Sequence, residues 1–304
     1  MNFNAVTVDV EDYFHASAFR ELAPFETWDR QPSRVEQSTR KTLELLAAFN
    51  LRATFFVLGW VAERYPSLIR EIRAAGHDVG CHSYAHPLIY HLTPAQFRDD
   101  TRRALASIED ALGSAVRAYR APTFSITSRS LWALEVLLEL GIAVDSSIFP
   151  TRNHLYGILD APRQPFRIRV GRSELAEFPL PTLKTGPWGL PVTGGAYLRL
   201  LPYRLQAKAL ERMERRAQPF VLYFHVWELD PEQPHLASAL GPKFYHYAGL
   251  RRTEARLRRL FKAFSFGKLP ESLDARAPVY EVASADGPAG ETWCLRQWPG
   301  TSDK

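Results

Sequence analysis

The chain alternates short apolar runs with longer segments in which apolar residues recur every three or four positions. The short runs predict strands at 5–8, 53–58, 77–81, 115–119, 142–144 and 220–224. The longer segments predict amphipathic helices at 33–49, 61–75, 93–112, 128–140, 205–217 and 250–264. Strands and helices therefore follow one another in turn, which predicts an α/β fold with a parallel sheet wound with helices.

Two stretches lack this regular pattern. From 149 to 202 the chain is rich in proline and glycine turns, and only 174–178 resembles a short strand. Such a long irregular segment within a compact domain usually carries function. The mixed segment 268–304 predicts a C-terminal tail of unassigned structure. We therefore expect one domain over 1–267, with a loop-rich insertion at about 149–202, followed by the tail.

Composition excludes several classes of protein. Hydrophobic residues at 46% and charged residues at 23% of 304 are ordinary values for a globular chain. The net charge of +5 comes with arginines spread over predicted helices, so we expect no nucleic-acid partner. Two cysteines without a CxxC motif predict no disulfide framework. Without a signal-like N-terminus or an apolar run of membrane-spanning length, we expect a cytoplasmic protein with no transmembrane segment.

Reactive side chains follow five of the predicted strands. The carboxyl ends of parallel strands meet at one edge of a sheet, so these side chains are expected to lie together. They are Asp9 with Glu11 and Asp12, His82 with His86, Arg120, Asp145, and His225.

Two histidines four residues apart and one carboxylate suit zinc or a similar divalent ion, with room left for water and substrate. Such an ion lowers the pKa of its water towards neutrality and makes it a nucleophile. A free carboxylate can take the water's proton and His225 can give one to a departing nitrogen. The sequence contains no GxSxG, GxxxxGK[ST] or GxGxxG motif. These residues therefore favour hydrolysis of an amide-like bond.

Five ordered motifs resemble those of polysaccharide deacetylases with the NodB homology domain, carbohydrate esterase family 4. The resemblance covers residues 4 to about 266, and it is closest to the subgroup found in exopolysaccharide loci with exosortase systems. It implies a deformed (β/α)7 barrel, similar to a TIM barrel, that removes N-acetyl groups from amino sugars in a polymer. The motifs are 7-TVDVED-12, 82-HSYAH-86, 120-RAP-122, 145-DSS-147 and 221-VLYFH-225.

The resemblance also implies residue roles. Asp9 would be the general base, oriented by Arg120, and His225 would be the general acid. The backbone N–H of Thr123 would stabilise the oxyanion. Asp145 would tune or hold His225, although a helix-capping role explains this residue almost as well. His82 and His86 would bind the metal, which we expect to be zinc, with cobalt, nickel or manganese as alternatives.

The chain departs from the family pattern at two places. Family members have adjacent aspartates, base then ligand, whereas Val10 follows Asp9 here. The third ligand is therefore Asp12, which has the usual side-chain length, or Glu11, which shares the strand face of Asp9; we favour Asp12 slightly. In addition, Val226 stands where the subgroup usually has proline.

We expect an N-acetylated polysaccharide or oligosaccharide as substrate, and an association with polysaccharide synthesis or export machinery at the cytoplasmic face of a membrane. Tyr197, Trp188 and Trp227 are candidates for stacking on sugar rings. Two alternatives remain open: an amidase of the same fold acting on a small cyclic amide or ureide, and a catalytically silent glycan-binding scaffold.

Overall fold

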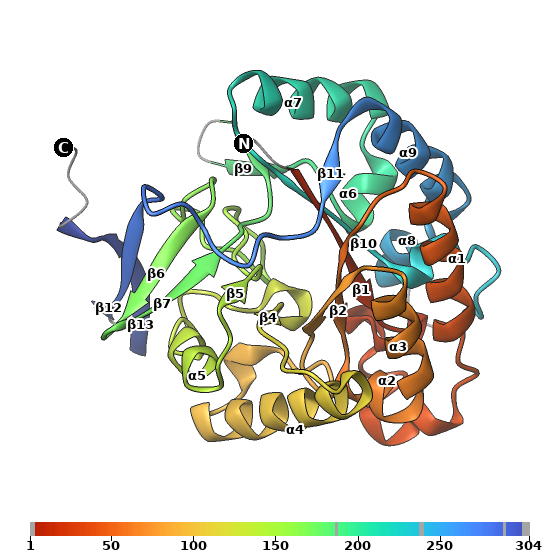
Figure 1. The fold of residues 1–304 in the computed structure, drawn as a ribbon, viewed down its shortest axis with the longest axis horizontal. Helices are drawn as coiled ribbons and strands as arrows, with labels where there is room; N and C mark the ends of the chain where they lie inside the picture. The colour runs from red at the N-terminus through yellow and green to blue at the C-terminus, as the bar shows by residue number, and fades with distance from the viewer. Residues whose placement is uncertain (1–3, 186–187, 237–239, 288–289, 300–304) are drawn as a thin grey trace.

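The computed structural model describes residues 4–185, 188–236, 240–287 and 290–299 and contains a central sheet with helices packed around it (Figure 1). Its parallel part has the order β10-β1-β2-β3-β4-β5-β7. The α/β prediction is therefore confirmed. These strands are β1 (Asn4–Val10), β2 (Thr54–Val57), β3 (Asp78–Cys81), β4 (Ala118–Tyr119), β5 (Val144–Asp145), β7 (Ser173–Glu177) and β10 (Val221–His225).

Most helices agree with the predicted periodic segments, although 61–75 is divided into α2 and α3, with Pro66 at the start of α3. Helices α6 and α8 lie where no helix was predicted. Helix α4 begins with a capping box at Thr93 and ends at Gly113, whose φ is 68°. The helices are α1 (Val35–Ala47), α2 (Gly59–Arg64), α3 (Pro66–Ala74), α4 (Pro94–Leu112), α5 (Ala133–Glu139), α6 (Gly195–Leu200), α7 (Tyr203–Arg215), α8 (Leu240–Tyr247) and α9 (Leu250–Ala263).

The stretch 149–202 contains more regular structure than its sequence indicated. Strand β6 (Phe166–Val170) pairs antiparallel with β7, and β8 (Thr182–Thr185) pairs with β9 (Trp188–Pro191). The alternation of buried Phe166 and Ile168 with Arg167 and Arg169 is the signal of a half-buried strand. The prediction of an irregular insertion was therefore wrong for these strands.

The segment 268–299, to which we assigned no structure from the sequence, contains two strands. Strand β12 (Val279–Gly287) pairs with β6, and β13 (Gly290–Gln297) returns antiparallel beside it. Before them, the short strand β11 (Phe266–Gly267) pairs with the start of β1. Backbone pairing with the central sheet therefore fixes this segment, although its sequence has no strongly apolar run.

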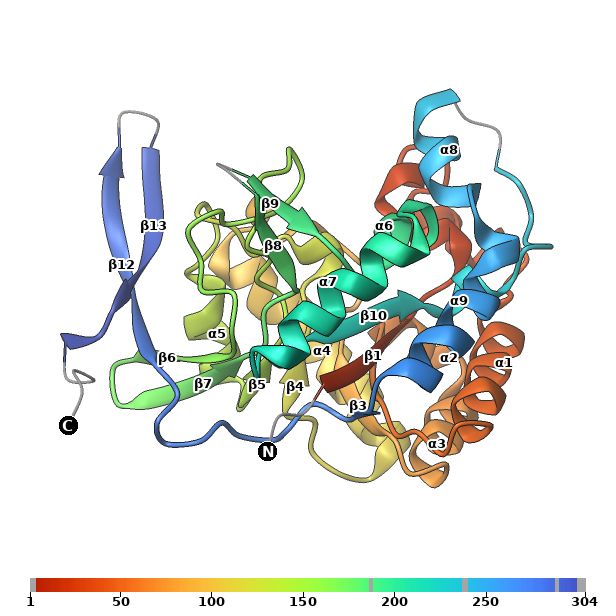
Figure 2. The same cartoon turned by 90° about the horizontal axis from the view of Figure 1, so that it is seen from above.

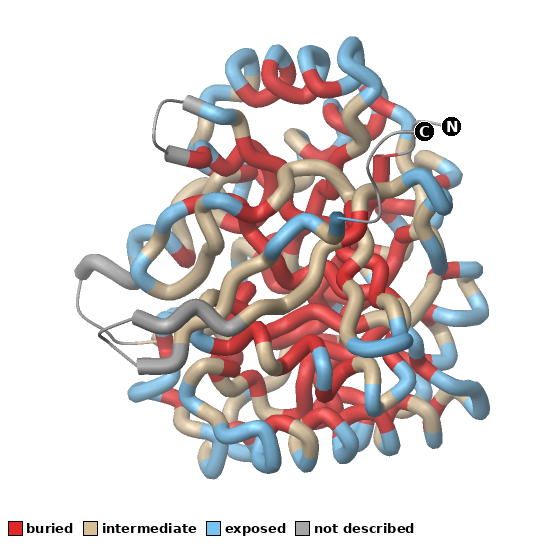
Figure 3. The backbone as a smooth tube through the Cα atoms, turned by 90° about the vertical axis from the view of Figure 1, so that its left-hand side faces the viewer, coloured by how far each residue is buried: buried red, intermediate tan, exposed pale blue. Residues whose placement is uncertain are grey.

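Strands β1, β2 and β10 are almost wholly buried, whereas the outer faces of the helices are exposed (Figure 3). In the described part of the chain, no helix is long and apolar enough to cross a membrane. At the carboxyl ends of the strands the chain forms short 3-10 helices, which bring polar side chains to the edge of the core. They are η1 (Tyr13–His15), η2 (Ser17–Phe19), η3 (Phe25–Arg30), η4 (Ile89–His91), η5 (Pro122–Phe124) and η6 (Val226–Leu229).

Candidate active site

A cavity of about 250 Å³ opens at the carboxyl edge of the sheet. Its walls come from the ends of β1, β3 and β10, from the turn after β4, and from α6 and α8. Segments far apart in the sequence therefore meet here. The lining includes most of the predicted site residues, namely Asp9, Glu11, His82, His86, Thr123, Tyr197, His225 and Trp227.

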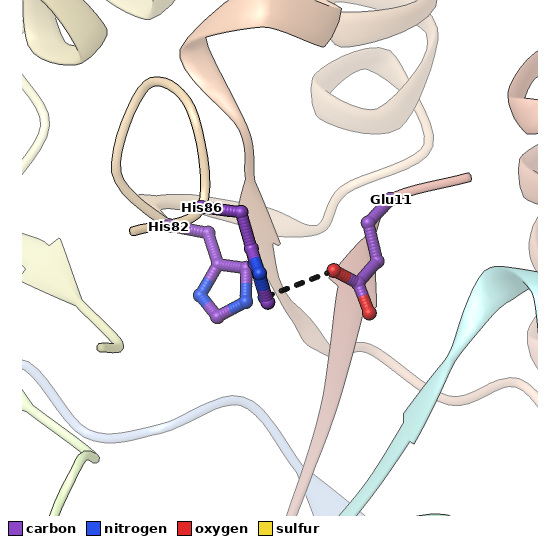
Figure 4. A group of neighbouring side chains, drawn as sticks. All are labelled: Glu11, His82 and His86. Atoms are coloured by element: carbon purple, nitrogen blue, oxygen red, sulfur yellow. Dashed lines mark ion pairs between the residues drawn. The ribbon is translucent and has the colours of Figure 1, made fainter. Parts of the chain in front are cut away.

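Glu11, His82 and His86 form a cluster that can hold a metal ion. Each offers one ligand atom, and these atoms all lie within 4.8 Å of one another. The two imidazoles face the Glu11 carboxylate, and His86 Nε2 lies 3.2 Å from Glu11 Oε2 (Figure 4). Glu11 Oε2 is buried without a hydrogen bond to any described residue. A buried carboxylate oxygen without a donor fits a site built for a cation.

The protonation of the two histidines also suits a metal site. Burial lowers the pKa of His82 to about 4 and the pKa of His86 well below its usual value, so both rings are neutral at pH 7. Neutral imidazole is the form that binds metals. His82 Nδ1 lies 2.8 Å from the carbonyl oxygen of Arg120, to which it can donate only in the tautomer that leaves Nε2 free as a ligand. These residues therefore fit a divalent ion.

Asp12, which we slightly favoured as the third metal ligand, is not part of this cluster. Its carboxylate accepts hydrogen bonds from the Ser33 hydroxyl and from the backbone N–H groups of Tyr13, Arg34 and Val35, at 2.7 to 3.1 Å. It caps η1 and secures the start of α1. Glu11, whose strand-face parity matches that of Asp9, takes the place beside the imidazoles. The structure thus favours the alternative ligand over Asp12.

Asp9 is held by the predicted arginine. Arg120 is fully buried, and its Nη1 donates to Asp9 Oδ1 at 2.8 Å. The same nitrogen donates to Thr7, and the rest of the guanidinium bonds to Ser146 and lies over the ring of Phe56. Because the arginine is fixed from several sides, it fixes the orientation of the carboxylate as well.

His225 has a carboxylate partner that we did not predict. Its Nδ1 lies 2.7 Å from Glu228 Oε1, while its Nε2 faces Glu11 at 3.4 Å and Asp9 at 3.8 Å. Burial alone lowers the pKa of His225, but the hydrogen bond to Glu228 and the nearby carboxylates together raise it to about 9. The ring is therefore protonated at pH 7, as a general acid requires.

Glu228 is itself held by Arg199 of α6. The Arg199 Nε donates to Glu228 Oε2 at 2.7 Å, and both side chains are buried. Burial raises the pKa of Glu228, but Arg199 and His225 outweigh it and bring the pKa to about 2. The remaining guanidinium nitrogens donate to the carbonyl groups of Tyr245, His246 and Ala248. Arg199 therefore joins the partner of His225 to the end of α8.

Asp145 does not contact His225. It accepts a hydrogen bond from Ser147 at 2.6 Å and lies against Glu177, with both carboxyl groups fully buried. Ser147 in turn accepts from the backbone N–H of Ala121, next to Arg120. The structure thus corrects the expected contact: Asp145 supports the turn that carries Arg120, and Glu228 takes the position beside His225.

The predicted substrate-binding residues have different surroundings. Trp227 stacks on His225 and on His246, at ring-centroid distances of 4.9 and 4.0 Å, and its indole N–H donates to Glu11. Trp227 therefore positions Glu11, and it also lines the cavity. Tyr197 lines the cavity and bonds to Tyr156 through their hydroxyl groups. The side chain of Trp188 lies outside the described parts.

Backbone strain is concentrated at the edge of this cavity. His86 and Thr123 have φ values of 54°, a conformation that is uncommon for residues other than glycine. Thr123 lines the cavity, and its hydroxyl bonds to Ser17. At the start of α6, Gly194 has a φ of 78°, and a Cβ there would overlap the ring of Tyr223. The chain thus adopts unfavourable backbone conformations where the candidate site residues need them.

Two important residues, Glu228 and Arg199, had no role in the sequence-based prediction. Glu228 follows His225 by three residues, and η6 brings these positions together. This spacing is a signal that could have identified Glu228. Arg199 lies 26 residues before His225 in sequence and is brought to it only by tertiary packing, so no local pattern marks it.

Comparison with known families gives two matches along the chain. Residues 25–143 match the family described as polysaccharide deacetylase, and residues 146–274 match a family described as a domain of unknown function (DUF3473). The boundary between the two matches lies near the end of β5, within the central sheet.

Curated relatives match only part of the chain. A peptidoglycan-N-acetylglucosamine deacetylase of Bacillus cereus is 33% identical over 98 residues, which are 32% of this chain and 36% of the relative. A chitooligosaccharide deacetylase of a Bradyrhizobium species is 34% identical over 100 residues, 33% of this chain and 43% of the relative. The chain thus matches less than half the length of each of these relatives.

Similarity of fold extends much further along the chain. A Mycobacterium smegmatis structure, named as a candidate polysaccharide deacetylase, aligns with a TM-score of 0.53 and 20% identity. The alignment covers 89% of this chain and 94% of that one. The mixed α/β fold is therefore that of the polysaccharide deacetylase structures, a deformed TIM-like barrel.

Proposed function

We propose that the chain belongs to the polysaccharide deacetylase family, whose model matches residues 25–143, and that it is a metal-dependent hydrolase. It removes N-acetyl groups from the amino sugars of an exopolysaccharide or of its precursor. The observation that carries this proposal is the convergence of three features around one cavity: a carboxylate–arginine pair, a ligand cluster of two histidines and a glutamate, and a histidine bonded to a carboxylate.

In this proposal Glu11, His82 and His86 hold one divalent ion, with zinc expected from their two nitrogens and one oxygen. When bound, the ion supplies Lewis acidity that polarises the acetamide carbonyl and activates water. Asp12 remains the structural cap of η1 and is no longer proposed as a ligand.

Asp9 acts as the general base and takes the proton of the attacking water. Arg120 donates to this carboxylate and holds it in place. The water oxygen bonds to the acetyl carbon, and the backbone N–H of Thr123 is the proposed donor to the oxygen that gains charge.

His225 acts as the general acid. Its Nε2 faces the cavity because Nδ1 is bonded to Glu228, so the proton on Nε2 can pass to the sugar nitrogen as the C–N bond breaks. Acetate and the free amine of the sugar are the products. Tyr197 is proposed to contact the sugar from the α6 wall.

The test is acetate release from N-acetylglucosamine oligomers, with metal analysis of the same protein. We expect activity to disappear on chelation and to return with zinc. Asp9→Asn should lower kcat by about 10²–10⁴ because it removes the base, while the zinc content stays unchanged. Asp110→Asn, an exposed aspartate at the end of α4, is the control.

Full turnover by the Asp9→Asn protein would reject Asp9 as the base. The same samples should be offered a small cyclic amide and a ureide, because turnover of these alone would assign the site to the small-amidase alternative. Glycan binding with neither turnover nor bound metal would favour the silent scaffold.

A further inference from the structure

A second cavity, of about 340 Å³, lies between the end of β6, helix α5 and the hairpin of β12 and β13. It shares no lining residue with the cavity that contains Asp9 and His225. The hairpin projects on one side of the molecule and α8, which borders the candidate active site, lies on the other (Figures 1 and 2). The second cavity is therefore a separate site.

Three of the seven tryptophans of the chain line this cavity, and all three are partly exposed. Trp132 precedes α5, and its indole N–H donates to the carbonyl group of Arg129. Trp293 of β13 is tied to the same segment, because its backbone N–H donates to the carbonyl oxygen of Ser128 at 2.7 Å. Trp298 is anchored through its backbone to Val279. The backbone thus holds three aromatic rings around one space that solvent can reach.

The charged residues of the cavity leave an excess of negative charge. Glu135 and Glu281 both line it, and neither carboxylate is bonded to another residue in the described parts of the chain. Arg169 also lines it, but its guanidinium is bonded to Glu174 at 3.0 Å and lies 4.8 Å from the centre of the Trp298 ring. The two carboxylates therefore remain available to a ligand, beside the aromatic rings that line the cavity.

We propose that this cavity binds a cationic amino sugar, the glucosamine unit of a deacetylated glycan. Pyranose rings pack their C–H faces on indoles, carboxylates accept hydrogen bonds from hydroxyl and ammonium groups, and an ammonium group is attracted to an aromatic face. A volume of about 340 Å³ lies within the range of small-molecule sites. An acetylated unit lacks the positive charge, so it binds more weakly.

This inference rests on the proposed function, which generates such an amine from an N-acetyl group. A chain held at the second cavity by units already deacetylated stays near the protein, and its remaining acetylated units reach the active site at a raised local concentration. The enzyme would then act faster on partly deacetylated polymers than on short oligomers.

The test is binding of the glucosamine tetramer to the full-length protein, measured by titration calorimetry with the N-acetylglucosamine tetramer as comparison. The double variant Glu135→Gln/Glu281→Gln keeps the shape of the cavity and removes its charge. We expect it to bind the glucosamine tetramer at least tenfold more weakly than wild type, and Asp110→Asn to bind like wild type. Trp293→Ala should also lose binding, with a folded circular-dichroism spectrum as the check.

Acetate release from a short oligomer should be unchanged in the double variant, because no active-site residue is altered. Binding by the double variant that equals that of Asp110→Asn would overturn the proposal. The measurement uses a ligand that is already deacetylated and needs no turnover, so failure of the proposed hydrolysis and failure of this site give different results.

Discussion

Two groups of buried carboxyl side chains lie at the carboxyl edge of the sheet, and they differ in what compensates their burial. Glu228 after β10 is bonded to Arg199 and to His225, and its pKa is about 2. Asp145 and Glu177 at the ends of β5 and β7 lie against each other, and burial raises the pKa of both. One group is ionised at pH 7, whereas the other retains a proton.

Burial alone therefore does not identify a carboxylate that positions a catalytic residue. A carboxylate can hold an imidazolium in place only while it is ionised, and in a buried position this requires a cation such as Arg199. Without a bonded cation, two neighbouring acids keep a proton between them and act as a neutral structural pair. The difference assigns the positioning of His225 to Glu228 and structural support to Asp145.

The largest effect is expected when the cation is removed. Arg199→Met leaves Glu228 buried without its arginine, and removing one partner of a buried ion pair costs about 3–5 kcal/mol. The free energy of unfolding, measured by urea denaturation, should fall by that amount. Arg40→Met is the matched control, because Arg40 bonds Glu36 and Glu71 at the surface, where such pairs contribute about 0–1 kcal/mol. Equal losses in the two variants would show that Glu228 does not depend on its arginine.

The second-largest effect is expected on kcat, and it allows variants of the two groups to be compared directly. Glu228→Gln removes the charge that keeps His225 protonated, so kcat for acetate release should fall by about 10²-fold, within the range of general acid catalysis. Asp145→Asn keeps an oxygen for the Ser147 hydroxyl and should change kcat less than about tenfold.

The readout that separates positioning from mere folding is the KM of each variant, because a misfolded site would change KM and kcat together. We expect Glu228→Gln to keep the KM of wild type, and Glu228→Asp to recover part of kcat. If Asp145→Asn lowered kcat more than Glu228→Gln does, Asp145 and not Glu228 would be the residue that holds His225.

The two groups also show how far the sequence could predict the site. Hydrophobic periodicity was enough to predict that five residues meet at one edge, because each lies at or after the end of a strand. They are Asp9, His82, His86, Arg120 and His225. The choice between Glu11 and Asp12 depends on the turn into η1, where the N–H groups of Arg34 and Val35 draw in the Asp12 carboxylate. Those donors lie more than twenty residues away in sequence, and no local pattern shows them.

Long-range packing explains the other differences. Glu177 reaches Asp145 because β7 pairs with β5, although 32 residues separate them in sequence. The hairpin of β12 and β13 is fixed by an edge pairing with β6, and edge strands need no continuous apolar run. Hydrophobic periodicity in the sequence therefore predicted where the strands end. The residues that distant segments bring beside the strand ends could be identified only in the structure.

The smallest effect is a change in how stability depends on pH. Because the pKa of Glu177 is raised, the folded protein keeps a proton that the unfolded chain releases above about pH 4. Stability from this source is therefore present at low pH and is lost as pH rises.

Glu177→Gln cannot ionise, and its amide oxygen can still accept from the backbone N–H of Ile148. The variant should match wild type near pH 4 and become more stable than wild type towards pH 8. Urea denaturation at several pH values measures this, with Glu139→Gln on the surface of α5 as the control that should show no such trend. A variant that loses stability relative to wild type as the pH rises would mean that Glu177 is ionised and that a cation compensates both groups alike.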